Sequence, residues 1–324
     1  MELRVSSARP WLSARLLMTA MAVHLAAAGI SPAAEPRPAD GANEILDALK
    51  QAHRIVVLGD SITYGGRWVA LFDCWLEDTG TTGMVINMGL SSETVSGLSE
   101  DGHAGGKFPR PDLHERLDRV LRVSRPDVVL ACYGMNCGIY QPFDKVRFSR
   151  FKDGTERLHR AVTAAGAQIV HLTPPIYDQR PDKLGPAKGT DYDAVLSRYT
   201  EWLLSKRADG WLVIDVHGPM QAALEQARQT APDFFFSPDT VHPGPAGHWQ
   251  IARAVLDGLG VSDNWTEDRA EALLPLVTER LNLLRDAYLS AAGHQRPGIR
   301  QGPPLDEAIP AANRLTEKIR SRQP

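Results

Sequence analysis

The sequence predicts an α/β fold, a three-layer α/β/α sandwich around a central, mostly parallel sheet of the flavodoxin-like kind. Five short runs rich in Val, Ile and Leu alternate along the chain with amphipathic stretches of helical period. Strands covered by helices on both faces read as such continuous apolar runs. Ligands of these sheets bind beyond the carboxyl ends of the strands. Residues at those ends are therefore the candidates for function.

The expected elements follow one another in a regular order. The strands are expected at 55–58, 84–87, 127–132, 168–172 and 211–215. The helices are expected at about 67–78, 112–123, 144–165, 191–208, 218–230 and 244–258. Pro219 near the start of one helix and Gly166 after the end of another are usual boundary residues.

A helical C-terminal extension is predicted at 261–324. One apolar face arises at helical spacing from Ala270, Leu273, Leu274, Val277, Leu281, Leu284 and Tyr288. We expect this face to pack on the main domain, and a dimerisation arm is the alternative. A Pro/Gly-rich stretch at 296–304 separates this helix from a last short one at about 305–320.

The first 34 residues predict a secretory signal peptide. Three arginines precede an apolar run at 16–30, and small residues follow. The run is shorter than a membrane span. The cleavage region contains no cysteine to which a lipid anchor could be attached, so we expect no such anchor. We therefore expect an exported protein, periplasmic or extracellular, without a stable membrane anchor. Cleavage is expected after Ala28, Ala33 or Ala34.

The domain organisation and composition follow from these segments. A linker or N-terminal segment is expected at 35–50 and the main α/β domain at 51–260. The formal net charge of -3 argues against a nucleic-acid partner. The sequence contains no phosphate-loop or metal-ligand motif, so no cofactor and no metal are expected. The pattern does not predict an oligomeric state.

Chemically useful residues follow four of the expected strands or lie in loops on the same side. Ser61 comes directly after the first strand, where its hydroxyl would be available. Alone, this pattern is more typical of a turn with a helix N-cap. Three further segments change that balance, and together the four segments are far more specific than any one. They read GDSIT at 59–63, NMGLS at 87–91, YGMN at 133–136 and DTVHPG at 239–244.

With these four segments the chain resembles the SGNH/GDSL hydrolases over about residues 53–258, which implies the flavodoxin-like SGNH fold and serine esterase activity. The resemblance implies that Ser61 is the nucleophile, His242 the general base and then acid, and Asp239 the orienting carboxylate. It also implies an oxyanion hole formed by the N–H groups of Ser61 and Gly89 and the amide of Asn136. These roles suit the chemistry, because a serine hydroxyl needs a base and a tetrahedral oxyanion needs fixed donors.

Two alternatives stand beside this assignment. The family commonly has Asp where this chain has Cys137, so a thiol is expected close to the site, and a cysteine nucleophile is the sharper but less favoured reading. The three cysteines leave at least one thiol unpaired, and Cys74 and Cys132 are expected to be small buried hydrophobes. Asp215 and His217 form a second carboxylate–imidazole pair, which we interpret as a strand end satisfied by turn hydrogen bonds.

The four segments predict ester hydrolysis, but they do not identify the acyl group or the alcohol of the natural substrate. Long loops after the second, third and fourth strands are expected to line the site with His103, Phe108, Tyr140, Phe143 and Tyr177. Of these, His103, Tyr140 and Tyr177 are expected to contact substrate, together with Asp60. Aromatic side chains with polar tips suit sugar rings, and no extended apolar lid is visible. The prediction is hydrolysis of small acyl esters, O-acetyl groups on carbohydrate in particular. A lysophospholipase or broad lipid esterase and a non-catalytic glycan-binding module are the alternatives.

Overall fold

The structure is a computed structural model, and it describes residues 41–261 and 265–322. Within these residues, five strands form one parallel sheet in the order β2-β1-β3-β4-β5, which is the flavodoxin-like order. The predicted fold is confirmed, and every strand begins and ends within one residue of its expected bounds. The strands are β1 (Arg54–Gly59), β2 (Met84–Asn87), β3 (Val128–Cys132), β4 (Gln168–Leu172) and β5 (Leu212–Ile214).

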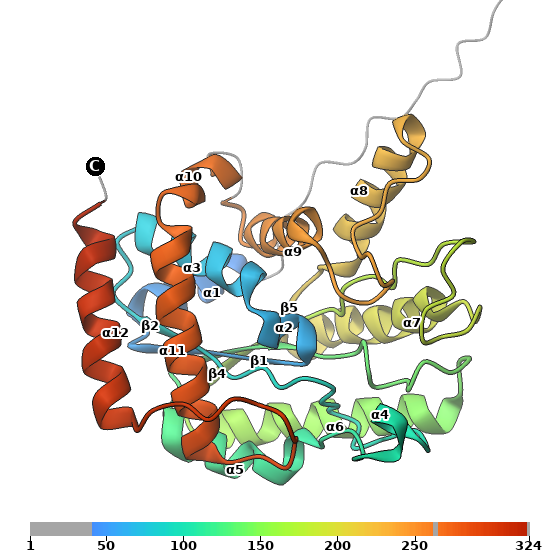
Figure 1. Ribbon diagram of the computed structural model, residues 1–324, viewed down its shortest axis with the longest axis horizontal. Helices are drawn as coiled ribbons and strands as arrows, with labels where there is room; N and C mark the ends of the chain where they lie inside the picture. Colours follow the sequence, from blue (N-terminus) through green and yellow to red (C-terminus); the bar gives the residue numbers. More distant parts are fainter. Residues whose placement is uncertain (1–40, 262–264, 323–324) are drawn as a thin grey trace, which may run out of the picture. The chain divides into compact units, whose positions relative to one another are not determined.

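Helices cover both faces of the sheet (Figure 1). The helices α3 (Arg67–Asp78) and α9 (Pro245–Gly258) pack against each other above the sheet in that view. The helices α5 (Leu113–Ser124) and α6 (Lys145–Ala164) lie below it. The helix α7 (Tyr192–Ser205) joins the lower layer, because the Tyr199 ring stacks on Phe151 of α6 at 4.3 Å. A short 3-10 helix, η1 (Lys206–Asp209), follows α7, and α8 (His217–Thr230) follows β5.

A helix also precedes the first strand. Residues 42–51, most of which the sequence placed in a linker or N-terminal segment, form α1 (Ala42–Gln51). Ile45 and Leu49 of this helix are buried in the main core. One turn separates these two apolar side chains, so they lie on the same face. The α/β domain therefore begins earlier than expected. The predicted signal peptide lies outside the described residues.

The C-terminal extension closes one edge of the sheet. It contains α10 (Glu267–Glu271), α11 (Leu274–Ala292) and α12 (Leu305–Arg320). The helix α11 packs against β2, α3 and α5 and buries Val277, Leu281 and Leu284. The prediction that this helix packs on the main domain is confirmed. Its apolar face is used inside the chain, which removes the reason to regard it as a dimerisation arm.

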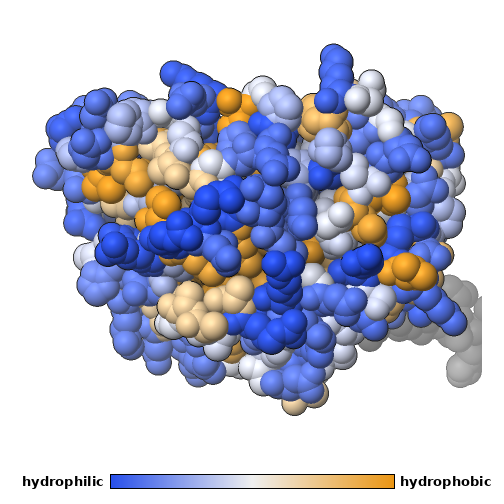
Figure 2. All heavy atoms as spheres, turned by 90° about the horizontal axis from the view of Figure 1, so that it is seen from below, coloured by the Kyte–Doolittle hydropathy of each residue, from blue (hydrophilic) through white to orange (hydrophobic). Residues whose placement is uncertain are grey.

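The surface of the described residues is mixed in polarity. Figure 2 shows the face that α5 and α6 cover, on which hydrophilic side chains predominate and apolar ones form separate small groups. Scattered apolar side chains are normal on a folded surface. Within the described residues, no helix is both long enough and apolar enough to span a bilayer.

Candidate active site

Ser61 lies where the first strand ends and a short helix begins. The strand β1 ends at Gly59, Asp60 is the N-cap, and Ser61 is the first residue of α2 (Ser61–Gly65). The Asp60 carboxylate accepts the N–H of Ile62 at 3.0 Å, which fixes the entry into the helix. A side chain at Gly59 would come within 2.2 Å of Thr63 Oγ1 and 2.8 Å of the Cys132 carbonyl oxygen. Glycine is thus required for this tight strand-to-helix turn.

Three side chains form a continuous hydrogen-bonded chain that ends at Ser61. His242 Nε2 lies 2.8 Å from Ser61 Oγ, and His242 Nδ1 lies 2.7 Å from Asp239 Oδ2. The imidazole and the carboxylate are both about half exposed, so the group opens to solvent. A nucleophile, a base within reach of it and a group that orients the base are the arrangement that activates a serine.

The loop carrying Asp239 and His242 is organised by its own hydrogen bonds. The N–H groups of Val241 and His242 both donate to Asp239 Oδ1, at 3.0 and 2.7 Å. Burial raises the pKa of the Asp239 carboxyl, but hydrogen bonds from His242 and from the backbone outweigh it and lower that pKa below its ordinary value. Asp239 is therefore ionised at neutral pH. It can orient the imidazole and stabilise its protonated form.

A second carboxylate, that of Asp178, accepts backbone hydrogen bonds from the same loop. The sequence analysis did not predict this role. Asp178 is fully buried, and its Oδ2 accepts the N–H groups of Phe236 and Ser237 at 2.6 and 2.8 Å. Arg228 of α8 donates to its other oxygen at 2.7 Å. An acidic residue in the loop after β4 carries no local sequence signal for this role, because these partners lie 50 to 59 residues away.

The structure contradicts the assignment of Gly89 to the oxyanion hole. Its N–H donates to the Asn87 side-chain oxygen at 2.9 Å, and the Asn87 amide donates in turn to the Thr63 carbonyl at 2.7 Å. A side chain at Gly89 would lie 2.6 Å from the Tyr64 nitrogen. Gly89 is therefore required because α2 packs on it. Its N–H has an acceptor inside the protein.

A turn three residues later faces Asn136 instead. The Asn136 Nδ2 group donates to the Glu93 carbonyl oxygen at 3.3 Å. The preceding residue, Ser92, has a φ of 69°, a left-handed conformation that is costly for residues other than glycine. Among the described residues, neither the Ser92 N–H nor the Ser61 N–H has an acceptor in the protein. Both are free to donate to a ligand.

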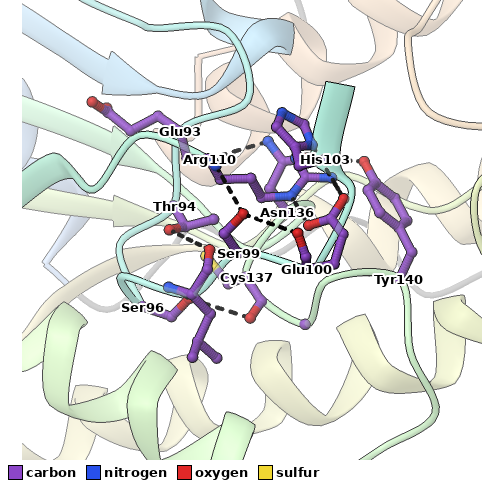
Figure 3. A network of polar contacts seen from close by, with 12 residues as sticks. Glu93, Thr94, Ser96, Ser99, Glu100, His103, Arg110, Asn136, Cys137 and Tyr140 are labelled. Carbon is purple, nitrogen blue, oxygen red and sulfur yellow. Dashed lines mark hydrogen bonds and ion pairs between the residues drawn. The ribbon is translucent and has the colours of Figure 1, made fainter. Parts of the chain in front are cut away.

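Asn136 belongs to a polar network that the sequence analysis did not predict (Figure 3). Its Oδ1 accepts hydrogen bonds from Arg110 Nη1 and from the Tyr140 hydroxyl, both at 2.9 Å. The Arg110 guanidinium also pairs with both carboxylate oxygens of Glu100, at 2.6 and 2.7 Å. His103 Nδ1 lies 3.2 Å from Glu100 Oε1. Arg110 and Glu100 lie in the long loop between β2 and α5, whose composition gave no sign of this pairing.

The four side chains expected to contact substrate differ in solvent exposure. Asp60 is 3% exposed and Tyr177 is 2% exposed. The Tyr177 hydroxyl donates to the Leu184 carbonyl oxygen, so it supports the loop after β4, and the expected substrate contact is wrong for this residue. Tyr140 is buried and holds Asn136. His103 is part-buried, with its ring edge-on to Phe108 at 5.4 Å, and it is the least buried of the four.

All three cysteines are buried and unpaired. Burial raises the pKa of the Cys137 thiol to about 12, although the Val95 and Ser96 N–H groups lie against it and favour the thiolate. A buried, protonated thiol is not a nucleophile at neutral pH. The alternative of a cysteine nucleophile therefore has no support in the structure.

The second carboxylate–imidazole pair is structural, as the sequence interpretation preferred. The Asp215 carboxylate accepts the Thr173 hydroxyl at 2.8 Å and the Gly218 N–H at 3.2 Å. The His217 ring is buried, with Nε2 3.2 Å from Ser197 Oγ. Asp215 and His217 thus face different partners. Within the described residues, no group of three or more His, Cys, Asp or Glu side chains is arranged to hold a metal ion.

Comparison with known proteins gives the family and the fold. The sequence model of the GDSL-like lipase/acylhydrolase family matches residues 57–250. A gut microbial diltiazem-metabolizing enzyme is 24% identical with a TM-score of 0.50, and the match covers 64% of this chain and 47% of that one. A mutant of Axe2, an acetyl-xylooligosaccharide esterase of Geobacillus stearothermophilus, is 20% identical with a TM-score of 0.50, over 66% of this chain and 97% of that one. At these identities the structures share a fold. No curated protein matched significantly.

Proposed function

Because the chain belongs to the GDSL-like lipase/acylhydrolase family and is thus a carboxylic ester hydrolase, we propose that Ser61, His242 and Asp239 carry out the hydrolysis. The observation that carries the proposal is the hydrogen-bonded chain from Asp239 through His242 to Ser61, with steps of 2.7 and 2.8 Å. It joins residues 181 positions apart in the sequence. Such a chain gives a serine hydroxyl the base that it needs.

The proposed reaction proceeds through an acyl-serine. Ser61 Oγ attacks the ester carbonyl carbon while its proton passes to His242 Nε2, and Asp239 stabilises the resulting imidazolium at Nδ1. The tetrahedral oxyanion accepts hydrogen bonds from the Ser61 N–H, the Ser92 N–H and Asn136 Nδ2. Collapse breaks the bond to the alcohol oxygen, which takes the proton from His242. Water then attacks the acyl-serine by the same route and releases the acid.

For the substrate, we propose small acyl esters, and acetyl groups on carbohydrate in particular. The half-exposed His242 and Asp239 side chains are compatible with a bulky polar alcohol such as a glycan, which would reach them without the opening of a lid. The similar fold of an acetyl-xylooligosaccharide esterase is compatible with this choice. An exported location, which the signal-like N-terminus predicts, would place the enzyme where glycans are met.

The test is hydrolysis of p-nitrophenyl acetate by the mature chain beside Ser61→Ala, with fluorophosphonate labelling of both. We expect the variant to lose kcat by at least ~10⁴-fold, because removal of a serine nucleophile has effects of that size or larger, and to lose labelling entirely. Equal Tm values would show that the fold is intact. A folded wild-type protein that neither hydrolyses nor labels would instead favour a non-catalytic glycan-binding module.

The acyl and alcohol preference is measured separately. Rates on p-nitrophenyl esters from acetate to palmitate are compared with acetate release from acetylated xylo-oligosaccharides. We expect activity to fall steeply with acyl length and acetate to be released from the glycan. A preference for long chains would sink the carbohydrate assignment and favour a lysophospholipase or broad lipid esterase.

A further inference from the structure

The Asn136 amide is held in one of its two possible orientations. Arg110 Nη1 and the Tyr140 hydroxyl both donate to Asn136 Oδ1, each at 2.9 Å. A guanidinium has donors and no acceptor, whereas a tyrosine hydroxyl can either donate or accept. A reversed amide would bring its NH₂ group against the NH₂ of Arg110, with no hydrogen bond between them. Arg110 is therefore the partner that decides which end of the amide faces the site.

Arg110 is itself fixed with unusual completeness. Its guanidinium makes a bidentate pair with Glu100, at 2.6 and 2.7 Å, and its backbone N–H donates to Ser99 Oγ at 2.9 Å. The residue is only 9% exposed, and Figure 3 shows it between Glu100 and Asn136. Bidentate arginine–carboxylate pairs add geometric precision to their strength. The guanidinium thus cannot follow a rotating amide.

The fixed orientation has a consequence for an oxyanion. Because Oδ1 accepts the hydrogen bond from Arg110, Asn136 Nδ2 points the other way. One of its two hydrogens is donated to the Glu93 carbonyl oxygen at 3.3 Å. The second hydrogen remains for another acceptor. The opposite orientation would present carbonyl lone pairs to the developing negative charge and raise the barrier.

We propose that Arg110 is a positioning residue of the oxyanion hole, which keeps Asn136 Nδ2 turned toward the reacting carbonyl, and that Glu100 holds Arg110 in place for this task. The inference rests on the proposed function, because it concerns how Asn136 serves that reaction. Arg110 acts through Asn136. Its removal is therefore felt in kcat, since the donor matters most when charge develops in the transition state.

A double-mutant cycle on purified mature protein tests the proposal, with p-nitrophenyl acetate as the substrate. Asn136→Ala is expected to lower kcat ~10²- to 10³-fold, the usual cost of one oxyanion donor. Arg110→Met is expected to lower kcat roughly 10- to 30-fold with KM changed less than about 2-fold. In the Asn136→Ala background, Arg110→Met should change kcat by less than about 2-fold, because residues that act through one another are not additive. Arg160→Met, an exposed arginine of α6, is the matched control for the lost charge.

The outcomes separate the two proposals. A full further loss in the Asn136→Ala background, or a rise of KM in place of a fall of kcat, would overturn the inference while leaving the esterase intact. A folded wild-type chain without hydrolysis or phosphonate labelling overturns the proposed function and the inference with it. If Arg110→Met does not fold, Arg110→Lys replaces it in the same cycle. The lysine keeps the charge but cannot bond both Glu100 and Asn136 as the guanidinium does, so its smaller loss should also vanish when Asn136 is absent.

Discussion

Asp60 adjoins the nucleophile Ser61, and its carboxyl group is almost fully buried. Burial opposes the ionisation of this carboxyl. Burial raises the pKa of its carboxyl to about 6, although the Ile62 N–H and the charges of His242 and Arg110 favour the ionised form. The folded pKa therefore exceeds the ordinary value of 3.8. The stability that this group contributes is complete below about pH 4 and is lost as the pH rises through 6.

Asp60→Asn should remove this pH dependence, because the amide oxygen can still accept the Ile62 N–H but carries no charge. As the pH rises from 4 to 7, the unfolding free energy of the variant should increase relative to that of the wild-type chain, by about 2 to 3 kcal/mol in total. Urea denaturation of both proteins at several pH values measures the difference. Two stability curves that run parallel across this range would show that Asp60 does not titrate as stated.

The choice between Gly89 and Ser92 illustrates what a residue pattern leaves open. The segment after β2 was recognised from its glycine and its place at the end of a strand. Which N–H is free depends on the Asn87 side chain, which turns back to accept the Gly89 N–H at 2.9 Å. A serine with a φ of 69° gives no sequence signal for a left-handed turn, because glycine and asparagine are the usual residues there.

At the scale of elements, an internal ion-pair cluster ties the C-terminal extension to the main domain. Arg280 of α11 is buried and lies 2.8 Å from Asp73 and 2.5 Å from Glu77, both on α3. Burial raises the pKa of the Asp73 carboxyl to about 6, and the Arg280 charge opposes that rise. Without the guanidinium, two carboxylates would face each other out of water.

Arg280→Met is therefore expected to lower the unfolding free energy by roughly 3 kcal/mol or more at pH 7, the cost of leaving buried charges without their partner. Arg320→Met is the matched control. Arg320 approaches the same Glu77 at 3.7 Å but is about half exposed, so its loss should cost less than about 1 kcal/mol. Urea unfolding of the two variants provides the comparison. Equal losses in both would argue against the buried cluster as the main tie between α11 and α3.

The elements differ in how far the sequence specified them. The strands were placed closely because β-branched apolar runs covered on both faces are distinctive. The helix α1 was missed because only Ile45 and Leu49 mark its buried face clearly, and the Pro/Ala-rich stretch before it resembles a linker. The turns at Ile139 and Tyr140, both with positive φ, direct Tyr140 toward Asn136, and nothing local in the sequence indicates them.

At the scale of the whole molecule, the C-terminal extension reaches the helix that carries the nucleophile. Arg285 of α11 donates to the Tyr64 carbonyl oxygen at 3.0 Å, and its guanidinium lies 4.3 Å from the centre of the Tyr64 ring. Tyr64 belongs to α2, three residues after Ser61. Residues beyond the family match at 57–250 thus support the position of the nucleophile.

The predicted signal peptide gives a test at the same scale. In a bacterial host with a secretion pathway, the full chain should be exported and shortened, since a charged start, an apolar run and small residues guide export and cleavage. Intact-mass measurement of the exported protein should show a chain that begins after residue 28, 33 or 34. Leu25→Arg, which places a charge in the apolar run, is the control expected to retain the full-length chain in the cytoplasm. Export at full length would contradict the cleavage prediction.

The sequence by itself determined the order of strands and helices, the family and the segments that carry Ser61, Asn136, Asp239 and His242. It did so because periodicity and short motifs are local properties of the chain. The tertiary structure alone decided which donors are free, since hydrogen-bond partners come from distant segments. The Gly89 N–H, for example, donates to the Asn87 side chain and is therefore not free for an oxyanion. Arg110 emerged because the fold brings the loop between β2 and α5 to the end of β3, a contact that no local pattern encodes.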